Sequence, residues 1–248
     1  MAVYVIGDLH LSFSTSKPMD IFGPRWHDHD KLIEQNWKNK VKETDTVIVP
    51  GDISWGMTLE EAKADFDFIE NLPGKKIFFK GNHDYYWQTS AKVNKFIAEN
   101  DYKTLCFMHN NAMEVENFII CGTRGWYTDE KDNLADYTTN SKIVNREVGR
   151  LKMSVEDAKR IHDQVKSETG EDKEIIGFLH FPAYFKDYIC EELIDVFAEN
   201  GIKRVYYGHI HGNYTSAPKL YYRSVNFFIV SADYLSFNPI EVERHYTI

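Results

Sequence analysis

Short apolar runs recur along the chain, and each ends abruptly in glycine or in a polar residue with a metal-binding group. The five runs are VYVIGDLH, TVIVPGDISW, KKIFFKGNHD, EIIGFLHFP and RVYYGHIHG. An apolar run without alternation is typical of a strand that is buried on both faces. The pattern therefore predicts five buried strands, each followed by a polar turn.

Helical periodicity fills much of the sequence between these runs. Ile33, Trp37 and Val41 recur at intervals of four, and apolar residues from Leu59 to Ile69 recur at intervals of three and four. This spacing places the apolar side chains on one face of a helix that packs on a sheet. Weaker patterns predict helices over residues 87–100, 140–167 and 187–200. Strands that alternate with helices are typical of βαβ units, which favours a largely parallel sheet.

The alternation breaks at two places, which predicts a second sheet. Residues 102–122 contain short strand-like runs separated by asparagine-rich turns, so a meander is expected there, and further short strands are expected near residues 214–217, 225–230 and 242–246. We therefore expect an α/β fold, a four-layer α/β/β/α sandwich with two mixed sheets flanked by helices, in a single domain over residues 1–248. The polar stretch 122–140 has no period and predicts a long loop, of a length that is usually functional or mobile.

Composition limits the type of protein. The chain has 248 residues, 43% hydrophobic and 27% charged, as is typical of globular proteins. Its formal net charge of -9 disfavours stable nucleic-acid or membrane binding. Three scattered cysteines, in no C-x-x-C pair, exclude a zinc finger and fit a reducing compartment. The first apolar run has no basic leader and soon reaches Asp8, so we expect a cytoplasmic protein.

Candidate metal ligands follow the predicted strands. In open α/β sheets, ligands bind at the carboxyl ends of the strands, where several loops meet. His209 and His211 stand at i and i+2, and an extended backbone would place both imidazoles on one side. The residues that the five runs bring to that end are Asp8, His10, Asp52, Asn82, His180, His209 and His211.

The size of this set predicts two metal ions. Seven ligands are too many for one ion that keeps a position open for water. If one carboxylate bridges two ions, the seven residues make eight bonds, four to each ion, and one imidazole of His-Ile-His goes to each. Mixed imidazole and carboxylate sites suit Mn, Fe, Zn, Co or Ni better than Mg or Ca. We expect two divalent transition-metal ions, with their identity open.

The five motifs GDLH, GDISW, KGNHD, LHFP and GHIHG resemble, in this order, those of the calcineurin-like metallophosphoesterase superfamily. They span residues 7–212, most of the chain. The resemblance implies a first ion held by Asp8, His10, Asp52 and His211. It implies a second ion held by Asp52, Asn82, His180 and His209, with Asp52 as the bridge. It further implies that His83 is the catalytic histidine and that Asp84 is the carboxylate that positions it.

The chemistry of such a site explains these residue types. Two cations about 3.5 to 4 Å apart lower the pKa of a shared water, clamp phosphoryl oxygens and neutralise charge in an in-line transition state. The resemblance implies hydrolysis of a phosphoester by attack of a metal-bridging hydroxide on phosphorus. The substrate would be a phosphomonoester or a phosphodiester, classes that include nucleotides. His83, near the leaving oxygen, would donate a proton or stabilise that oxygen.

Some of these residues also have simpler explanations. His10 alone could cap a helix, and Asp84 could make a local turn bond. Arg124, in GTRGW, either holds a substrate phosphate or forms a surface ion pair.

Two further polar or aromatic clusters are expected to be structural. His27 and His29 lie in RWHDHD, where a helix should begin, so we expect Asp28 or Asp30 to be the N-cap and the histidines to be bystanders. The aromatic segment 85–87 follows GNHD. Packing in the core at the start of a helix is favoured there over stacking on a substrate base or aryl group.

The motifs depart from two groups of the superfamily. Protein Ser/Thr phosphatases carry GDxVDRG and GNHE where this chain has GDISWGM and GNHD, which disfavours a protein phosphatase. Nucleases of the superfamily add DNA-binding segments, and this acidic chain has no such basic stretch. A phosphohydrolase with a small phosphorylated substrate remains. The alternative is a non-catalytic binding scaffold of the same fold, which is expected to lose ligands that this chain retains. The physiological substrate and the oligomeric state stay open.

Overall fold

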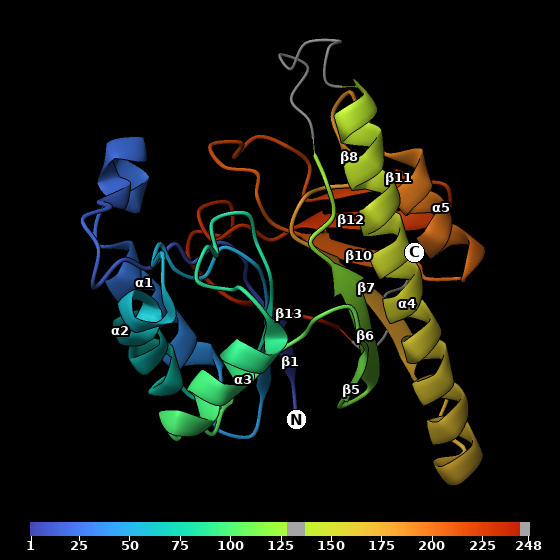
Figure 1. Cartoon of the computed structure of the whole chain (residues 1–248), viewed down its shortest axis with the longest axis horizontal. Helices are drawn as coiled ribbons and strands as arrows, with labels where there is room; N and C mark the ends of the chain where they lie inside the picture. The colour runs from blue at the N-terminus through green and yellow to red at the C-terminus, as the bar shows by residue number, and fades with distance from the viewer. Residues whose placement is uncertain (128–136, 244–248) are drawn as a thin grey trace.

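Two β-sheets pack face to face, and helices cover the outer face of each (Figure 1). The computed structural model describes residues 1–127 and 137–243. Three helices lie outside the first sheet: α1 (His29–Lys40), α2 (Leu59–Glu70) and α3 (Ser90–Glu99). Two lie outside the second sheet: α4 (Tyr137–Thr169) and α5 (Glu191–Glu199). The predicted α/β/β/α sandwich is therefore confirmed.

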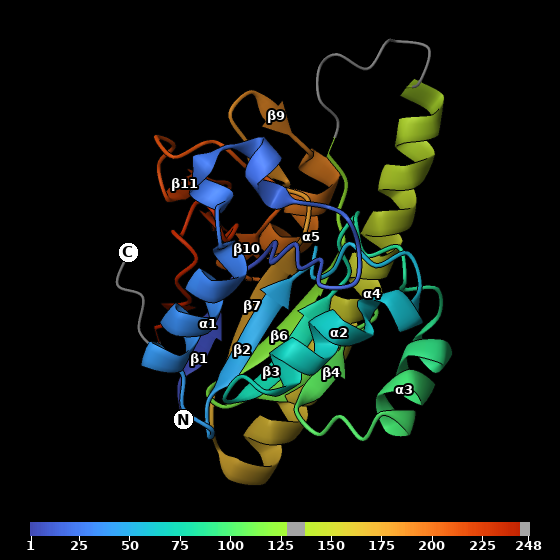
Figure 2. The same ribbon diagram turned by 90° about the vertical axis from the view of Figure 1, so that its left-hand side faces the viewer.

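The first sheet is mixed and has the order β13-β1-β2-β3-β4. Four neighbouring strands are parallel: β1 (Val3–Val5), β2 (Thr46–Pro50), β3 (Lys75–Phe79) and β4 (Leu105–Phe107). The short edge strand β13 (Ile240–Glu241) pairs antiparallel with β1. Figure 2 shows α1 and α2 in front of this sheet.

The second sheet is also mixed, in the order β11-β12-β10-β7-β6-β5. Its parallel strands are β12 (Val225–Ile229), β10 (Arg204–Tyr207), β7 (Glu174–Leu179) and β6 (Phe118–Thr123). The antiparallel edges are β11 (Lys219–Tyr222) and β5 (Met113–Val115). A separate hairpin joins β8 (Tyr184–Phe185) to β9 (Tyr188–Ile189).

Alternation along the buried strands divides the core into three layers. In β2, Ile48 points into the layer between the sheets, whereas Val47 and Val49 point toward the helices. The predicted helix faces pack in the outer layer, where Trp37 of α1 and Phe66 of α2 are fully buried. A strand with apolar groups on both faces fits only between two such layers, which explains the absence of polar alternation.

The two sheets are joined beyond the carboxyl end of β1. The backbone N–H of Gly7 donates to the carbonyl of Val230 at 2.7 Å, and that of Ala232 donates to the carbonyl of Gly7 at 2.9 Å. This bridge holds the loop after β1 against the chain that follows β12. It fixes the relative position of loops that come from different sheets.

Several predicted element boundaries are wrong. The helix expected over residues 87–100 begins at Ser90, because the side chain of Thr89 caps it and the aromatic residues before it pack in the core. The start of the helix expected over residues 187–200 belongs to the β8–β9 hairpin. The strand expected over residues 214–217 is displaced to β11, because residues 213–216 form a turn. The meander spans both sheets, since β4 extends the first sheet and β5–β6 the second.

The ends of two further elements also differ from the prediction. The helix expected over residues 140–167 extends from Tyr137 to Thr169, which shortens the expected loop 122–140, and residues 128–136 of that loop lie outside the described part. The strand expected over residues 242–246 is the earlier β13, and residues 244–248 are not described. No helix within residues 1–127 and 137–243 is long and apolar enough to cross a bilayer.

The start of α1 differs from the prediction in its side chains. Asp28 is the N-cap residue, but its carboxylate pairs with Lys31 and makes no cap hydrogen bond. His29 is buried against Trp26, and its Nε2 lies 3.3 Å from the carbonyl oxygen of His10. The segment that leads into α1 is thereby tied to the loop after β1.

The aromatic segment 85–87 mainly supports the core, as favoured from the sequence. Tyr86 and Trp87 are buried, and Tyr86 packs edge-on against Phe66 of α2. Tyr85, in contrast, is 48% exposed and its hydroxyl lies 3.4 Å from Nδ1 of His83.

Candidate metal centre

The seven candidate ligands lie on loops that follow five parallel strands, β1, β2, β3, β7 and β10. Because the two sheets pack face to face and are joined at Gly7, the carboxyl ends of these strands meet at one edge of the sandwich. The side chains that converge there are Asp8, His10, Asp52, Asn82, His180, His209 and His211.

One cluster consists of Asp8, His10 and His211. The Nε2 atoms of His10 and His211 are 3.1 Å apart, and Nε2 of His211 is 3.8 Å from Oδ1 of Asp8. Two imidazole nitrogens that face each other at this distance need a proton or a cation between them. We refer to these residues as the first ligand group.

A second cluster consists of Asp52, His180 and His209, and Asn82 joins it. The amide oxygen Oδ1 of Asn82 is 2.6 Å from Nε2 of His180 and 3.0 Å from Nδ1 of His209. An oxygen and two ring nitrogens therefore converge on one place. We refer to these four residues as the second ligand group.

Asp52 lies between the two ligand groups. Its Oδ2 is 3.6 Å from Nε2 of His10 and 3.5 Å from Nε2 of His180. This oxygen is buried and has no hydrogen-bond partner among the described residues. A buried, unpartnered carboxylate oxygen is costly unless it meets a cation or a proton. Its position fits a ligand that two ions share.

Hydrogen bonds at the far side of two imidazoles fix which nitrogen faces the centre. Nδ1 of His180 donates to the carbonyl of Pro50 at 3.1 Å, and Nδ1 of His211 donates to Oδ1 of Asp233 at 2.8 Å. Each ring then keeps the lone pair of Nε2 free for an ion. Burial, the largest single influence, opposes a charge on His211, but the hydrogen bond to Asp233 and the charges of Asp8, Asp233 and Asp52 together outweigh it and raise the pKa of His211.

Burial sets the protonation of the other groups. It raises the pKa of Asp8 to about 8 and that of Asp52 to about 6, because the charged carboxylates lose their hydration. It lowers the pKa of His180 to about 3 and that of His209 to about 2. The two imidazoles are therefore neutral donors of lone pairs, and the two carboxylates lack the positive charge that would keep them ionised.

The expected strand geometry of His-Ile-His is wrong. Strand β10 ends at Tyr207, and His209 has a φ of 69°, in the left-handed region. His209 and His211 thus reach the two ligand groups through a turn, which aims one imidazole at each group, rather than through the alternation of an extended strand.

Two motif glycines are required by close approach to the carboxylates. A Cβ on Gly81 would lie 2.1 Å from Oδ1 of Asp52, and a Cβ on Gly208 would lie 2.4 Å from Oδ2 of Asp8. Any larger residue at either position would displace a carboxylate from its ligand group. This explains the glycine that precedes the polar residues in GNHD and GHIHG.

His83 stands beside both ligand groups without joining either. Its backbone N–H donates to Oδ1 of Asp52 at 2.8 Å. Its half-buried ring packs 4.3 Å from the ring of Trp55, measured between centroids, and 5.6 Å from that of His10. Burial lowers the pKa of His83, although the charge of Asp52 opposes this. A neutral imidazole in this place can donate one N–H to a group bound over the ligands.

Asp84 supports the loops rather than the ring of His83. Its buried carboxylate accepts the backbone N–H of Asp52 at 2.9 Å, that of Gly81 at 2.7 Å and the hydroxyl of Tyr86 at 3.0 Å. The bond to Gly81 is the local turn bond that the sequence left open. Asp84 makes no hydrogen bond to the side chain of His83 among the described contacts.

Arg124 lies beside the second ligand group. Its backbone carbonyl accepts the N–H of His180 at 3.1 Å and that of Phe181 at 2.8 Å. Its guanidinium is 5.7 Å from the ring of Phe181, which in turn packs 4.5 Å from the ring of His209. Nε of Arg124 is buried, and within residues 1–127 and 137–243 it has no hydrogen-bond partner.

An aromatic pocket of about 410 Å³ opens over the first ligand group. Its walls are apolar or aromatic apart from the imidazoles of that group and of His83. We call it the aromatic pocket; it is lined by His10, Met19, Phe22, Trp26, Trp55, His83, His211, Gly212 and Tyr214.

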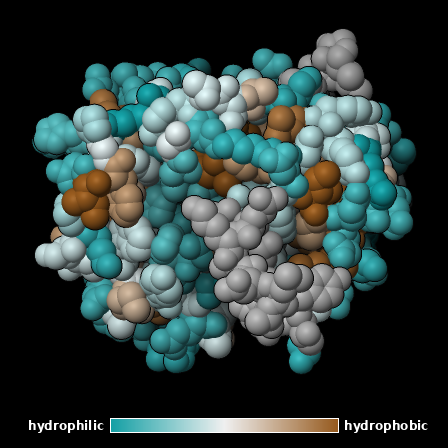
Figure 3. All heavy atoms as spheres, turned by 90° about the horizontal axis from the view of Figure 1, so that it is seen from above, coloured by the Kyte–Doolittle hydropathy of each residue, from teal (hydrophilic) through white to brown (hydrophobic). Residues whose placement is uncertain are grey.

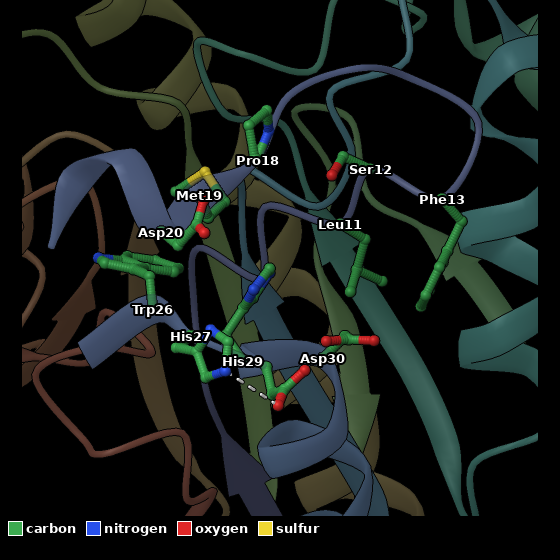
Figure 4. Close-up of a pocket in the computed structure, with 11 residues that line it drawn as sticks. Leu11, Ser12, Phe13, Pro18, Met19, Asp20, Trp26, His27, His29 and Asp30 are labelled. Atoms are coloured by element: carbon green, nitrogen blue, oxygen red, sulfur yellow. Dashed lines mark ion pairs between the residues drawn. The ribbon is translucent and has the colours of Figure 1, made fainter. Parts of the chain in front are cut away.

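The segment that leads into α1 forms one wall of the aromatic pocket. It contains two short 3₁₀ helices, η1 (Met19–Phe22) and η2 (Pro24–Trp26). Met19 and Trp26 also line a neighbouring hollow of about 310 Å³. Figure 4 shows Met19, Asp20 and Trp26 on one side of it, and on the other side it shows Leu11, Ser12 and Phe13. Seen from above, apolar side chains form separate patches on a mostly hydrophilic surface (Figure 3).

Sequence reasoning missed the residues that support the ligands. Asp233 follows the apolar run VNFFIVSA, so it carries the same signal as the five motifs, a polar residue at the end of a buried strand. The carbonyl of Pro50 and the rings of Trp26 and Tyr214 have no comparable signal, because their roles depend on tertiary contacts alone.

The donor set fits divalent transition-metal ions. Neutral imidazoles, an amide oxygen and carboxylates are ligands that such ions accept together. Cations would satisfy both the facing imidazole nitrogens of the first group and the unpartnered oxygen of Asp52.

Comparisons with known proteins agree with this fold. The Gene 66 protein of Mycobacterium phage D29 is 35% identical over 83 residues, which are 33% of this chain and 40% of the phage protein. The Gene 66 protein of Mycobacterium phage L5 is 32% identical over 122 residues, 49% of this chain and 57% of its own. The matches thus span less than two thirds of either phage protein.

A solved structure shares the fold over the full length. The crystal structure of phosphopantetheinyl hydrolase (PptH) from Mycobacterium tuberculosis superposes with a TM-score of 0.53 at 14% identity, and the match covers 100% of this chain and 98% of that one. The family model of the calcineurin-like phosphoesterases matches residues 1–213. With five motifs that converge at one edge of the sandwich, the chain belongs to the calcineurin-like phosphoesterase family.

Proposed function

We propose that the protein is a phosphohydrolase that uses two divalent metal ions to cleave a phosphoester. The observation that carries this proposal is Oδ2 of Asp52, a buried oxygen without a described partner that lies within 3.6 Å of a ligand nitrogen in each group. The first ligand group and Asp52 would hold one ion, and the second ligand group would hold the other. The identity of the ions stays open.

Bound ions would supply an activated water and positive charge for the phosphoryl oxygens. The residues of the chain supply the remaining functions. His180 and His211 are oriented by Pro50 and Asp233 so that Nε2 faces the centre. His83, outside both groups, would donate a hydrogen bond or a proton to the leaving oxygen.

The aromatic pocket supports a small substrate with an apolar or aromatic organic group. It adjoins the first ligand group and His83, so an ester bound over the ions would place its leaving group against Trp55. The non-catalytic scaffold is disfavoured because all seven ligands and His83 converge. We further propose one domain over residues 1–248, since β12 and β13 follow the matched region and complete the two sheets.

The proposal is tested with Asp52→Asn. The wild-type protein, supplied with Mn, Fe, Zn, Co or Ni in turn, is expected to hold two ions per chain by elemental analysis and to hydrolyse phosphomonoesters or phosphodiesters. Because Asp52 serves both groups, Asp52→Asn is expected to lose most of the metal and at least about 10²-fold in kcat/KM. Asp163→Asn, an exposed change on α4, is the matched control. A single ion per chain, or full activity in Asp52→Asn, contradicts the proposal.

A further inference from the structure

A second pocket, of about 260 Å³, lies at the carboxyl ends of β3 and β6 beside α4. Four of its lining side chains are cationic, in a chain whose net charge is -9. We call it the cationic pocket. The four cations are Lys80, Arg124, Arg146 and Arg150.

Carboxylates of the described residues do not balance these charges. Glu147 is fully buried; Arg150 pairs with it at 2.6 Å, and Arg146 lies at 4.0 Å from the same oxygen. The other oxygen of Glu147 accepts the hydroxyl of Thr123 at 2.7 Å. Glu147, already paired, and Asp84, whose charge also acts on Lys80, therefore face four cations.

Lys80 and Arg124 keep unused hydrogen-bond donors in this pocket. Lys80 donates to the carbonyl of Trp87 at 2.6 Å, which leaves two of its three N–H groups. Nε of Arg124 is buried without a partner among the described residues. Burial lowers the pKa of both, and the neighbouring cations Arg146 and Arg150 lower that of Arg124 further, although Glu147 opposes this. An anion would supply the missing acceptors and charge.

The cationic pocket adjoins the second ligand group. Lys80 directly precedes Gly81 and Asn82, and the backbone carbonyl of Arg124 accepts the N–H of His180. The ring of Phe181 separates the guanidinium of Arg124 from the imidazole of His209. The aromatic pocket, in contrast, adjoins the first ligand group, so the two pockets flank the centre on different sides.

We propose that the cationic pocket binds a second phosphate group of the substrate, while the phosphoester to be cleaved lies over the ligand groups. This inference rests on the proposed function and narrows its substrate to molecules with two phosphate groups. A phosphate group suits the pocket because the planar guanidinium of one arginine can donate two parallel N–H bonds to two oxygens of the same phosphate.

The test uses alkane bisphosphonates with linkers of one to six methylene groups, compared with monophosphonates of the same length. Their C–P bonds resist hydrolysis, so binding to the metal-loaded protein is measured by calorimetry whether or not the protein cleaves esters. One linker length is expected to give at least about tenfold tighter binding than its monophosphonate, because the second contact becomes intramolecular.

Three variants identify the residues responsible. Arg146→Gln and Arg150→Gln are expected to reduce this bisphosphonate preference severalfold or more; Arg146→Gln leaves the pair between Arg150 and Glu147 in place and so guards against a folding defect. Lys152→Gln removes the same charge from an exposed position of α4 outside the pocket and is expected to keep the preference.

The inference and the proposed function fail in different ways. No preference at any linker length, or an equal preference in Arg146→Gln, Arg150→Gln and Lys152→Gln, overturns the second phosphate site even if the protein hydrolyses esters. Absence of ester hydrolysis together with a preference that the two arginine variants lose overturns the proposed function alone, and the site for a second phosphate group then stands as a binding site.

Discussion

At the residue scale, backbone conformation aims the proposed ligands. Asp8, His10, Asp52 and His209 all have positive φ, between 47° and 69°. Such left-handed conformations are uncommon outside glycine, although Asp and His adopt them more readily than most residues. Each occurs just after a strand, where an extended continuation would carry the side chain away from the centre. The sites of strain therefore coincide with the sites of proposed chemistry.

The role proposed for His83 is tested by His83→Ala. Since the ring nitrogens of His83 make no hydrogen bond to either ligand group among the described residues, the variant is expected to keep both ions and its thermal stability. We expect kcat to fall by about 10²- to 10⁴-fold for an alkyl ester, whose leaving group needs a proton. The loss should be much smaller for a nitrophenyl ester, because a nitrophenolate leaves without protonation. Loss of metal in His83→Ala would show that the residue is a ligand instead.

Close approach of Gly208 to Asp8 gives a second prediction at this scale. In Gly208→Ala the new methyl group would lie 2.4 Å from Oδ2 of Asp8, so the carboxylate has to move. We expect a weakened first ligand group and about one ion per chain by elemental analysis, with the second ligand group retained. Gly149→Ala, whose methyl group would meet no atom within 4 Å, is the control and should keep two ions. Two tightly held ions in Gly208→Ala would refute this account.

The convergence of the seven candidate ligands is predictable from the sequence, because each one follows an apolar run. The sequence does not predict how Asp84 or Asp233 act, because a single carboxylate in a sequence carries no information about which N–H groups it will meet after folding. The resemblance implies that Asp84 positions His83, and in the structure its carboxylate accepts backbone N–H groups of Asp52 and Gly81. The sequence indicates which residues can bind a metal, whereas the hydrogen-bond partners of a carboxylate depend on tertiary structure.

At the scale of elements, the segment with η1 and η2 combines exposed apolar side chains with a buried contact at the proposed metal centre. Phe22 is 63% exposed and Ile21 is 71% exposed, yet Trp26 in the same segment is buried against His29 and His211. Arg25 anchors the segment by donating to the carbonyl of Asp233 at 2.7 Å. A buried anchor thus holds an apolar edge over the aromatic pocket.

This arrangement predicts a contribution of Phe22 to substrate binding. Phe22→Ala removes an exposed ring from the wall of the aromatic pocket, so stability should change by less than about 0.5 kcal/mol. We expect KM for esters with an aromatic leaving group to rise severalfold, and KM for a methyl ester to change little, as measured by steady-state kinetics. Ile21→Ala is the matched control, since Ile21 is similarly exposed and is not among the residues that line the pocket. Equal effects of both variants on KM would argue against the contact.

Element boundaries were harder to predict than element types. The run from residue 87 has helical spacing, but the buried rings of Tyr86 and Trp87 fix the chain in the core before Thr89 can cap α3. The His-Ile-His segment looks like a strand end, but Gly208 has to approach Asp8, which turns the backbone at His209. In both places a tertiary contact overrides the local pattern.

At the scale of the whole molecule, the proposed metal centre joins the two sheets. The first sheet supplies Asp8, Asp52 and Asn82, and the second supplies the histidines that follow β7 and β10. Ions bound by both sets would hold the two layers together. The sequence indicates two sheets and their shared edge, but it does not indicate which sheet β4 joins, because pairing between distant strands leaves no local pattern.

Metal removal is therefore expected to lower the stability of the entire sandwich. Ions that bind only the folded protein stabilise it by about 4 kcal/mol when their concentration exceeds Kd a thousandfold. For a chain of this size, that corresponds to a fall in Tm of about 10 °C on treatment with a chelator, measured by calorimetry. Asp52→Asn should show a much smaller chelator effect, and Asp163→Asn the full effect.

The same stabilisation should depend on pH with a definite sign. Without ions, burial raises the pKa of Asp8 to about 8 and that of Asp52 to about 6, so these carboxylates bind protons as the pH falls through this range. Protons then compete with the ions, and the difference in Tm between metal-loaded and chelator-treated protein should shrink from pH 8 to pH 6. His180 and His209 contribute little to this change, because their pKa values of about 3 and about 2 keep them neutral throughout. A difference in Tm that grows as the pH falls would mean that the ions are held by groups other than these two carboxylates.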